Sequence, residues 1–400
     1  MTSQSLNHPV LLLRNIVAEL TERQVLVVAA GFLLCIGLIM VGSASMGVAE
    51  ASYGNPFYFL TRHAIYLMIG LVVAALVLQV PMQFWSRYSY WVFLLALILI
   101  AIVLIPGIGR RVNGSMRWIG FGGITLQPSE VMKLAAVLAM AAYLVRRQEE
   151  VRSKALGFIK PLAGLFFVIV FLMAEPDFGA SIVVTMATTS MLFLAGAKLK
   201  QFFGVMLVLG FASIPVIMME SYRMKRLLAF TDPWADQYNT GYQLVQSLIA
   251  FGRGDWFGVG LGHSVQKLFY LPEAHTDFVF AVYAEEFGLL GVLVLLAAVA
   301  ALVTAALRIG QRAERAGQFY SAYVAYGLAV MLGVQSAINI GVNIGFFPTK
   351  GLTLPLVSYG GSSLVMVFAV LAILLRIDAE SGQVNERGVR RADGGDHGAR

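Results

Sequence analysis

The sequence predicts an all-α polytopic membrane protein with about ten transmembrane helices and a large extracytoplasmic loop between helices 7 and 8. Of its 400 residues, 58% are hydrophobic and 13% are charged, whereas a soluble protein carries about 45–50% and about 25%. The apolar residues form blocks near the length of about 20 residues that a helix needs to cross a bilayer. Because no stretch between the blocks could form a separate soluble domain of ordinary size, we expect one membrane domain.

Ten apolar blocks follow one another along the chain. They are 25–44, 64–80, 89–106, 129–145, 161–174, 178–196, 201–219, 276–307, 318–344 and 359–376. The fifth is short and the eighth and ninth are long, which indicates tilt or extension beyond the bilayer. The first lacks the small-residue cleavage site of a signal peptide, and nine spans follow it. We therefore divide the chain into an N-terminal cytoplasmic segment (1–24), a membrane domain (25–378) and a tail (379–400) that we expect to be disordered, because it is rich in Gly and charge.

The basic residues favour one orientation. With the N-terminus inside, the inner segments hold 18 of the 29 Lys and Arg, the outer segments hold 10, and Lys133 lies within a span. Positive charge gathers on cytoplasmic loops, so both termini are expected in the cytoplasm and the loop 220–275 outside. In that loop Tyr242, Val245, Leu248 and Ile249 fall at helical spacing, which predicts a short helix on the bilayer surface.

Several function classes are disfavoured by composition. Cys35 is the one cysteine, so disulfides and cysteine-based metal sites are excluded. The five histidines show no familiar metal-ligand spacing. The net charge of +7 is ordinary for a protein with basic cytoplasmic loops, so nucleic-acid binding is not expected.

Ionisable side chains gather at the outer ends of the spans. Glu130 and Lys133 start span four and lie three residues apart, so they share a helix face and can pair. The others in or beside spans at this end are Arg117, Glu175, Asp177, Arg226, His275, Asp277, Glu285, Glu286 and Lys350. An ionisable group within a span costs about 2.5–3.5 kcal/mol and usually lines a polar cavity or pairs with another. The clustering therefore predicts a charged cavity open to the outer leaflet.

Each group also has a purely structural interpretation. Glu130 and Lys133 can be a self-neutralising buried pair, and Asp277 can cap the helix that starts there. The remaining cases are a solvated turn at Glu175–Asp177, interface positions for Glu285 and Glu286, and a hydrogen-bonded interface residue for His275. The residues alone leave two classes of function open: a transporter or flippase for a polar head group, and an enzyme that acts on a lipid-linked substrate. Without a visible internal repeat or a midplane cluster of charges, the enzyme is favoured.

Five motifs in order resemble those of the SEDS family (shape, elongation, division and sporulation). They are Asn113–Ile119, Gln127–Glu130 with Lys133, Glu175–Gly179, His275–Phe278 and Ser358–Ser363. The resemblance extends over about 25–378. Three further stretches are similar to the division branch of the family rather than to its elongation branch: Gly241–Leu244, Leu271–Ala274 and Pro348–Leu352.

This resemblance implies a ten-helix SEDS fold and a peptidoglycan glycosyltransferase that polymerises lipid II for the septal wall. It implies an active site facing the periplasm, a place in the cytoplasmic (inner) membrane at the septum, and a class B penicillin-binding transpeptidase as partner in the division complex. The essential aspartate of the family falls on Asp277. Its cavity residues fall on Arg117, Glu130, Lys133, Asp177 and Arg226, and we also carry over Lys350.

The chemistry fits these residue types. A polyprenyl diphosphate is a good leaving group, and the acceptor sugar hydroxyl needs a base, for which we choose Asp277. Conversion of an α-linked diphosphate into a β-linkage implies inversion in a single displacement. Arg117, Arg226 and Lys133 would hold the diphosphate; Mg²⁺ or Mn²⁺ could share that task, although no spacing demands a metal. The alternatives are a lipid II flippase, which would need inner-leaflet access, and a non-catalytic division scaffold.

Overall fold

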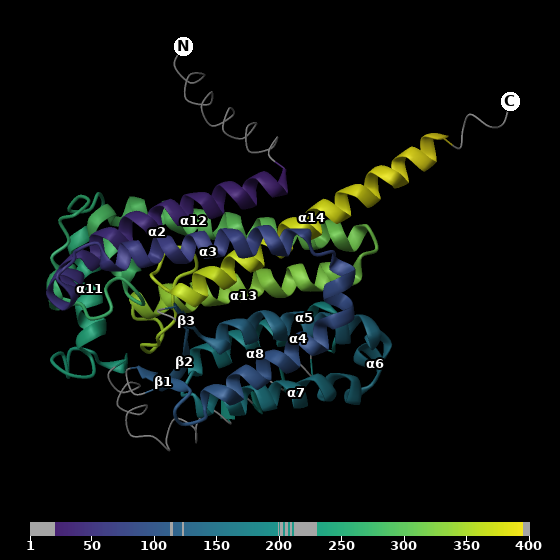
Figure 1. Ribbon diagram of the computed structural model, residues 1–400, viewed down its shortest axis with the longest axis horizontal. Helices are drawn as coiled ribbons and strands as arrows, with labels where there is room; N and C mark the ends of the chain where they lie inside the picture. Colours follow the sequence, from purple (N-terminus) through teal and green to yellow (C-terminus); the bar gives the residue numbers. More distant parts are fainter. Residues whose placement is uncertain are drawn as a thin grey trace, which may run out of the picture.

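The structure is a computed structural model that describes residues 21–112, 115–121, 124–198, 200, 203–204, 207–208, 210–211 and 230–394. Its helices run side by side, with the β-strands and α11 at one end of the bundle and α6 (Gln148–Ser153) at the other (Figure 1). Eight helices are long and apolar enough to cross a membrane. They are α2 (Glu22–Tyr53), α3 (Tyr58–Gln79), α4 (Met82–Val103), α5 (Pro128–Arg146), α7 (Ala155–Ala174), α12 (Val279–Arg315), α13 (Phe319–Asn343) and α14 (Gly361–Gly394).

The predicted spans are recovered wherever the structure describes them. The eight long helices and the shorter apolar helix α8 (Phe178–Leu194) fall on nine of the ten predicted segments. Most of the segment 201–219 lies outside the described residues, so the number ten stays a prediction. The disorder expected after residue 378 is wrong as far as Gly394, because α14 continues there. A nucleated helix gains one hydrogen bond with each added residue, and Ala, Glu, Gln and Arg in this stretch favour the helix.

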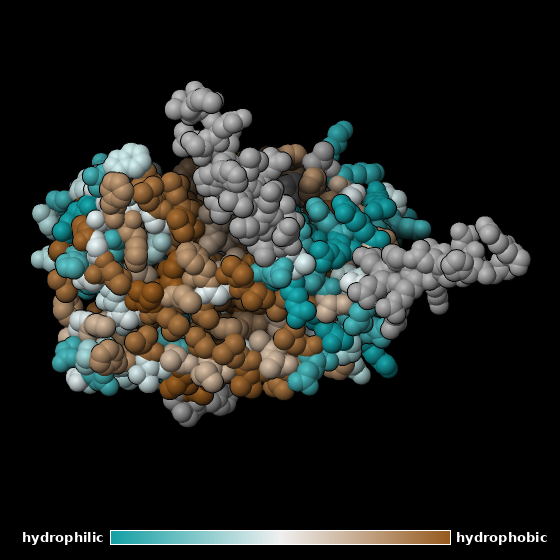
Figure 2. Space-filling view, turned by 90° about the horizontal axis from the view of Figure 1, so that it is seen from above, coloured by the Kyte–Doolittle hydropathy of each residue, from teal (hydrophilic) through white to brown (hydrophobic). Residues whose placement is uncertain are grey.

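Three helices form the centre of the bundle. The most apolar windows of α5, α13 and α14 are 78%, 67% and 72% buried, against 17–39% for the other candidate spans. The outer helices thus leave apolar side chains on the surface, as a bilayer requires. Figure 2 shows these as a brown band across the middle of the molecule, with hydrophilic residues toward the ends. This apolar band is therefore the part of the protein surface that faces the interior of a membrane.

Individual residues determine where α5 and α8 begin, next to the candidate site described below. Pro128 occupies the first turn of α5, where its missing N–H costs nothing. The side chain of Asp177 caps α8 by accepting a hydrogen bond from the Ala180 N–H. These two helix starts lie at the same end of the bundle as the strands, so the polar residues around them meet there (Figure 1).

A small sheet that the sequence analysis did not predict precedes α5. Strands β1 (Gly109–Val112), β2 (Ser115–Phe121) and β3 (Ile124–Leu126) pair antiparallel in the order β1-β2-β3. Trp118 faces Arg110 and Ile119 faces both Gly109 and Leu126. The sheet holds Arg117 in β2 and leads directly into α5.

The helix predicted within residues 220–275 is confirmed as α11 (Tyr242–Gly254). Its buried face, which includes Leu244, Val245 and Ala250, packs on α12 and α13. The apolar spacing therefore serves protein packing instead of contact with the bilayer surface. A short π-helical turn, η1 (Gln266–Tyr270), follows and contacts α2 and α11.

Candidate active site

The predicted pair between Glu130 and Lys133 is confirmed. Lys133 Nζ lies 2.8 Å from Glu130 Oε2, and their side chains are 2% and 9% exposed. Lys133 Nζ also donates to Gln335 Oε1 of α13 at 2.6 Å, and Gln335 Nε2 donates to the Thr353 carbonyl at 3.0 Å. The ion pair on α5 is thus connected through α13 to the segment 350–353.

Asp177 is buried at the start of α8, so the solvated-turn interpretation is wrong. Its Oδ2 accepts hydrogen bonds from Ser129 Oγ at 2.8 Å and Gln127 Nε2 at 3.1 Å, in addition to the helix cap on Oδ1. Three N–H and O–H donors thus hold the carboxylate, which joins the start of α8 to the start of α5.

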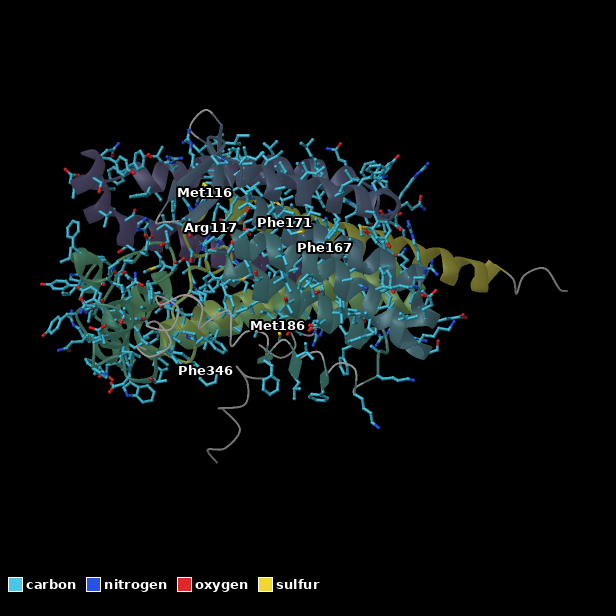
Figure 3. All side chains as sticks on the ribbon, turned by 90° about the horizontal axis from the view of Figure 1, so that it is seen from below. Met116, Arg117, Phe167, Phe171, Met186 and Phe346 are labelled. Atoms are coloured by element: carbon cyan, nitrogen blue, oxygen red, sulfur yellow. The ribbon has the colours of Figure 1, made fainter. Side chains whose placement is uncertain are left out.

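Arg117 reaches the same turn from strand β2. Its Nε donates to the Glu175 carbonyl at 3.1 Å and its Nη2 donates to the Pro176 carbonyl. Burial and the nearby Asp177 carboxylate raise the pKa of Glu175 to about 8, against the effect of Arg117. The contacts of Arg117 at this turn are with backbone oxygens. Figure 3 shows Arg117 beside Met116, with Phe171 and Phe167 further along α7.

Asp277 lies one residue before the N-cap of α12. That cap is Phe278, so the capping interpretation of Asp277 is wrong. The Asp277 carbonyl accepts hydrogen bonds from Asn339 Nδ2 at 2.9 Å and Asn343 Nδ2 at 3.0 Å. Its carboxylate lies against the segment 350–353, because a Cβ atom added to Gly351 would be 3.0 Å from Asp277 Oδ2. Asp277 is thus held by its backbone, with its side chain directed to the segment 350–353.

Lys350 contacts the residue that follows Asp177 and precedes the glycine that lies against Asp277. Its Nζ lies 4.4 Å from the ring centroid of Phe178, the residue after Asp177. The next residue, Gly351, is the one that contacts Asp277. The Leu352 carbonyl accepts a hydrogen bond from Asn339 Nδ2 at 2.6 Å, so α13 holds the segment 350–353 in place. The Lys350 side chain thus packs on the residue after Asp177, and its neighbour Gly351 lies against Asp277.

His275 is an aromatic packing residue in the turn that carries Asp277. Its ring centroid lies 4.4 Å from that of Phe59 and 5.6 Å from that of Tyr359. Burial lowers the pKa of the imidazole, despite an opposite effect of Glu273, so the ring is neutral at neutral pH. The expected hydrogen bond of its side chain is missing at Nδ1 among the described residues.

The structure therefore unites most of the predicted site. Glu130, Lys133, Asp177, Asp277 and Lys350 form one cluster through α13 and the segment 350–353, and Arg117 is attached through the turn at 175–176. Arg226 lies outside the described residues. The sequence analysis missed the amide side chains that connect the cluster. Gln335, Asn339 and Asn343 are four residues apart in one apolar span, and that spacing was the available signal.

The donor set does not favour a metal held by the protein alone. In the part of the chain that the structure describes, no group of three or more His, Cys, Asp and Glu could hold an ion. N–H and O–H donors also occupy both oxygens of Asp177.

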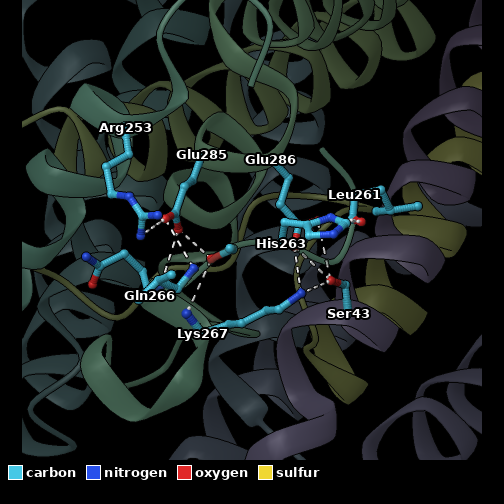
Figure 4. A network of polar contacts seen from close by, with 10 residues as sticks. Ser43, Arg253, Leu261, His263, Gln266, Lys267, Glu285 and Glu286 are labelled. Atoms are coloured by element: carbon cyan, nitrogen blue, oxygen red, sulfur yellow. Dashed lines mark hydrogen bonds and ion pairs between the residues drawn. The ribbon is translucent and has the colours of Figure 1, made fainter. Parts of the chain in front are cut away.

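Glu285 and Glu286 are fully buried, in contrast to their expected position at the membrane interface. Glu285 accepts from Ser264 Oγ at 2.5 Å and pairs with Arg253 at 2.9 Å. Glu286 pairs with Lys267 at 2.8 Å, and Lys267 Nζ also donates to Ser43 of α2. Figure 4 shows the two carboxylates side by side, each turned to its basic partner. These contacts tie the segment 253–267 to α12.

The pair on α5 gives a first prediction. Glu130→Gln or Lys133→Met alone should destabilise the protein by about 3–5 kcal/mol, because each leaves one buried charge uncompensated. The double variant should lose less than the sum of the two. Thermal unfolding in detergent measures this cycle, and additive losses would show that the groups are uncoupled. A double variant that is stable but inactive would assign the pair to substrate handling.

The fold and the site define a polytopic membrane protein with a cluster of ionisable side chains at one end of its helices. A family model described as "Cell cycle protein" matches residues 23–383, and the chain belongs to this FtsW/RodA/SpoVE family. The resemblance to SEDS proteins is thereby confirmed.

Relatives at about half identity share one description. A protein of Legionella pneumophila is 53% identical over 349 residues, which cover 87% of this chain and 89% of the relative. A protein of Hahella chejuensis is 51% identical over 356 residues, with 88% and 90% covered. Both are named "Probable peptidoglycan glycosyltransferase FtsW".

Solved structures show the same fold. A chain from a peptidoglycan synthase complex that coordinates polymerization and crosslinking is 28% identical with a TM-score of 0.73, covering 89% of this chain and 97% of that chain. The rod shape determining protein RodA of Thermus thermophilus is 26% identical with a TM-score of 0.65, covering 89% and 96%.

Proposed function

We propose that this peptidoglycan glycosyltransferase polymerises lipid II into glycan strands for the septal wall of dividing cells. Its activity as a glycosyltransferase follows from its family and from relatives at 53% and 51% identity. One structural observation carries the proposal: the Asp277 carboxylate lies outside α12, against Gly351 and next to Lys350, at one end of a membrane bundle. A lipid-linked sugar can reach that place while its polyprenyl tail stays in the bilayer.

Asp277 is the general base in this mechanism. The 4-hydroxyl of the acceptor sugar attacks C1 of the donor, the C1–O bond to the diphosphate breaks, and the hydroxyl proton passes to the carboxylate. The configuration at C1 inverts because the displacement occurs once. A carboxylate within hydrogen-bond reach of the hydroxyl performs this transfer, and the two amides on its carbonyl hold Asp277 in place.

Cationic side chains would receive the leaving diphosphate. Arg117, Arg226 and Lys133 are the proposed contacts, and Lys350, whose Nζ lies over the Phe178 ring, adds a further cation. Arg117 uses Nε and Nη2 for the carbonyls at 175–176, whereas a guanidinium has five N–H donors. It can therefore bind phosphate with its other N–H groups and still hold the turn. Lys133 would contact the diphosphate from its position beside Glu130, with which it forms a buried ion pair.

The protein's surroundings follow from the same proposal. Its helices span a membrane, and the basic-residue count supports cytoplasmic termini and a periplasmic active site. One structural neighbour comes from a peptidoglycan synthase complex, which supports a class B penicillin-binding transpeptidase as the partner of this chain.

Polymerisation of labelled lipid II by the purified chain with its transpeptidase partner tests the function. We expect glycan chains that a muramidase degrades, and none from the partner alone. Lipid II translocation in liposomes without polymer would indicate a flippase, whereas neither activity would indicate a scaffold. Either outcome contradicts the proposal.

A further inference from the structure

A side-chain amide of α13 binds the first turn of α12. Ala281 is the third helical residue after the N-cap Phe278, so its N–H has no partner four residues earlier within the helix. This N–H donates to Asn343 Oδ1 at 3.1 Å and to the Phe278 carbonyl at 3.1 Å. The Asp277 carbonyl accepts from Asn343 Nδ2 at 3.0 Å and from Asn339 Nδ2 at 2.9 Å. The Asn343 amide thus lies between the first turn of α12 and the carbonyl of the residue before its N-cap.

The orientation of this amide is determined by its neighbours. The Ala281 N–H can only donate, so it must face the amide oxygen. Nδ2 faces two carbonyls, those of Asp277 and of Asn339 at 2.8 Å, which can only accept. The Asn343 side chain is fully buried, and Ser247 Oγ of α11 donates to its carbonyl at 2.7 Å. The Asn343 amide therefore has a single orientation between α13 and the start of α12.

We propose that Asn343 is a positioning residue of the glycosyl transfer, which keeps Asp277 outside α12 with its carboxylate against Gly351. This rests on the proposed function, in which Asp277 is the base. Without the Asn343 amide, the Asp277 carbonyl keeps the hydrogen bond from Asn339 Nδ2 but loses the second one, and the Ala281 N–H can bind that carbonyl instead. That bond would draw Asp277 into the helical turn and move its carboxylate away from the segment 350–353.

A purely structural role makes a different prediction. Buried backbone groups need partners, so an amide that only satisfies them would affect stability and leave each folded molecule fully active. A displaced base lowers kcat instead, because a misplacement of about 1 Å can cost about 10²-fold in rate. Substrate binding is then little changed, so KM separates the two roles.

Asn343→Leu tests this in the purified chain with its partner and labelled lipid II. We expect kcat to fall by about 10²-fold, with KM within about twofold. Asn343→Gln keeps both polar groups one methylene further out, so an intermediate kcat is expected even if the Leu variant does not fold. Ser247→Ala is the control, because it removes a bond to the Asn343 backbone and leaves the amide in place.

Combination with Asp277→Asn distinguishes the two proposals. If Asn343 acts through Asp277, Asn343→Leu causes no further loss of kcat in the Asp277→Asn background. Multiplying losses, or single Leu and Gln variants within twofold of the wild-type kcat, would overturn the role of Asn343 and leave the base assignment intact. A wild-type rate for Asp277→Asn alone would instead overturn the base assignment, and with it any role of Asn343 through that base.

Discussion

Asp277→Asn is expected to slow glycan polymerisation by about 10²–10⁴-fold, the usual contribution of general-base catalysis. Asn keeps the size of the side chain but cannot accept the hydroxyl proton as a carboxylate does. The two hydrogen bonds to the Asp277 carbonyl involve the backbone and should persist. Folding, lipid II binding and association with the transpeptidase should therefore remain, and initial polymerisation rates with labelled lipid II measure the effect.

Glu273→Gln provides the matched control for this variant. Glu273 is an exposed carboxylate four residues before Asp277, and its removal should leave the rate nearly unchanged. The helix cap at Phe278 removes the alternative in which Asn simply replaces Asp as a cap. Near-wild-type synthesis by Asp277→Asn would refute the base assignment, although the family membership would stand.

The transmembrane helices could be predicted because the bilayer demands a simple pattern. Long apolar runs have few solutions other than helices, since each backbone group needs a partner within the segment. The Glu130–Lys133 contact followed from a three-residue spacing on one helix. Likewise, α11 followed from apolar spacing. Such features depend on neighbours in sequence, and the sequence shows them directly.

Features that depend on distant backbone groups could not be predicted. Arg117 donates to the backbone carbonyls of residues 175 and 176. Every residue type has such a carbonyl, so the side chains at these positions do not predict the contact. The amides of Gln335, Asn339 and Asn343 carry no charge, so a search for ionisable groups passed over them. The break in α12 also depends on distant backbone groups. The apolar run continues through Gly288, so the sequence predicts an unbroken helix there.

The segment 255–260, which follows α11, fills that break. The N–H groups of Leu289 and Leu290, which lose their helical partners at Gly288, donate to the carbonyls of Asp255 at 2.8 Å and Trp256 at 3.2 Å. In the other direction, the N–H groups of Val259 and Gly260 donate to the carbonyls of Glu285 and Glu286, both at 3.0 Å. The ion pairs of these two glutamates fix the same loop. The outer part of α12, which starts just after Asp277, is thus held by the loop.

Gly288→Ala should therefore disrupt both stability and activity. Gly288 has φ 64° and ψ −167°, a conformation in which a Cβ atom costs about 1–3 kcal/mol. That Cβ would also lie 2.4 Å from the Gly258 nitrogen and 2.7 Å from the Phe257 nitrogen, so the loop would have to move. We expect a lower melting temperature in detergent and a loss of polymerisation in the protein that remains folded, because the shift displaces the segment carrying Asp277.

Gly252→Ala in α11 is the matched control. A Cβ at this position would meet no atom within 4 Å, and Ala favours a helix over Gly by about 1 kcal/mol. The control should melt at or above the wild-type temperature with unchanged activity. If Gly288→Ala behaved like this control, the loop in the break would not determine the position of the outer part of α12. If it melted lower but kept the wild-type rate per folded molecule, the break would serve stability alone.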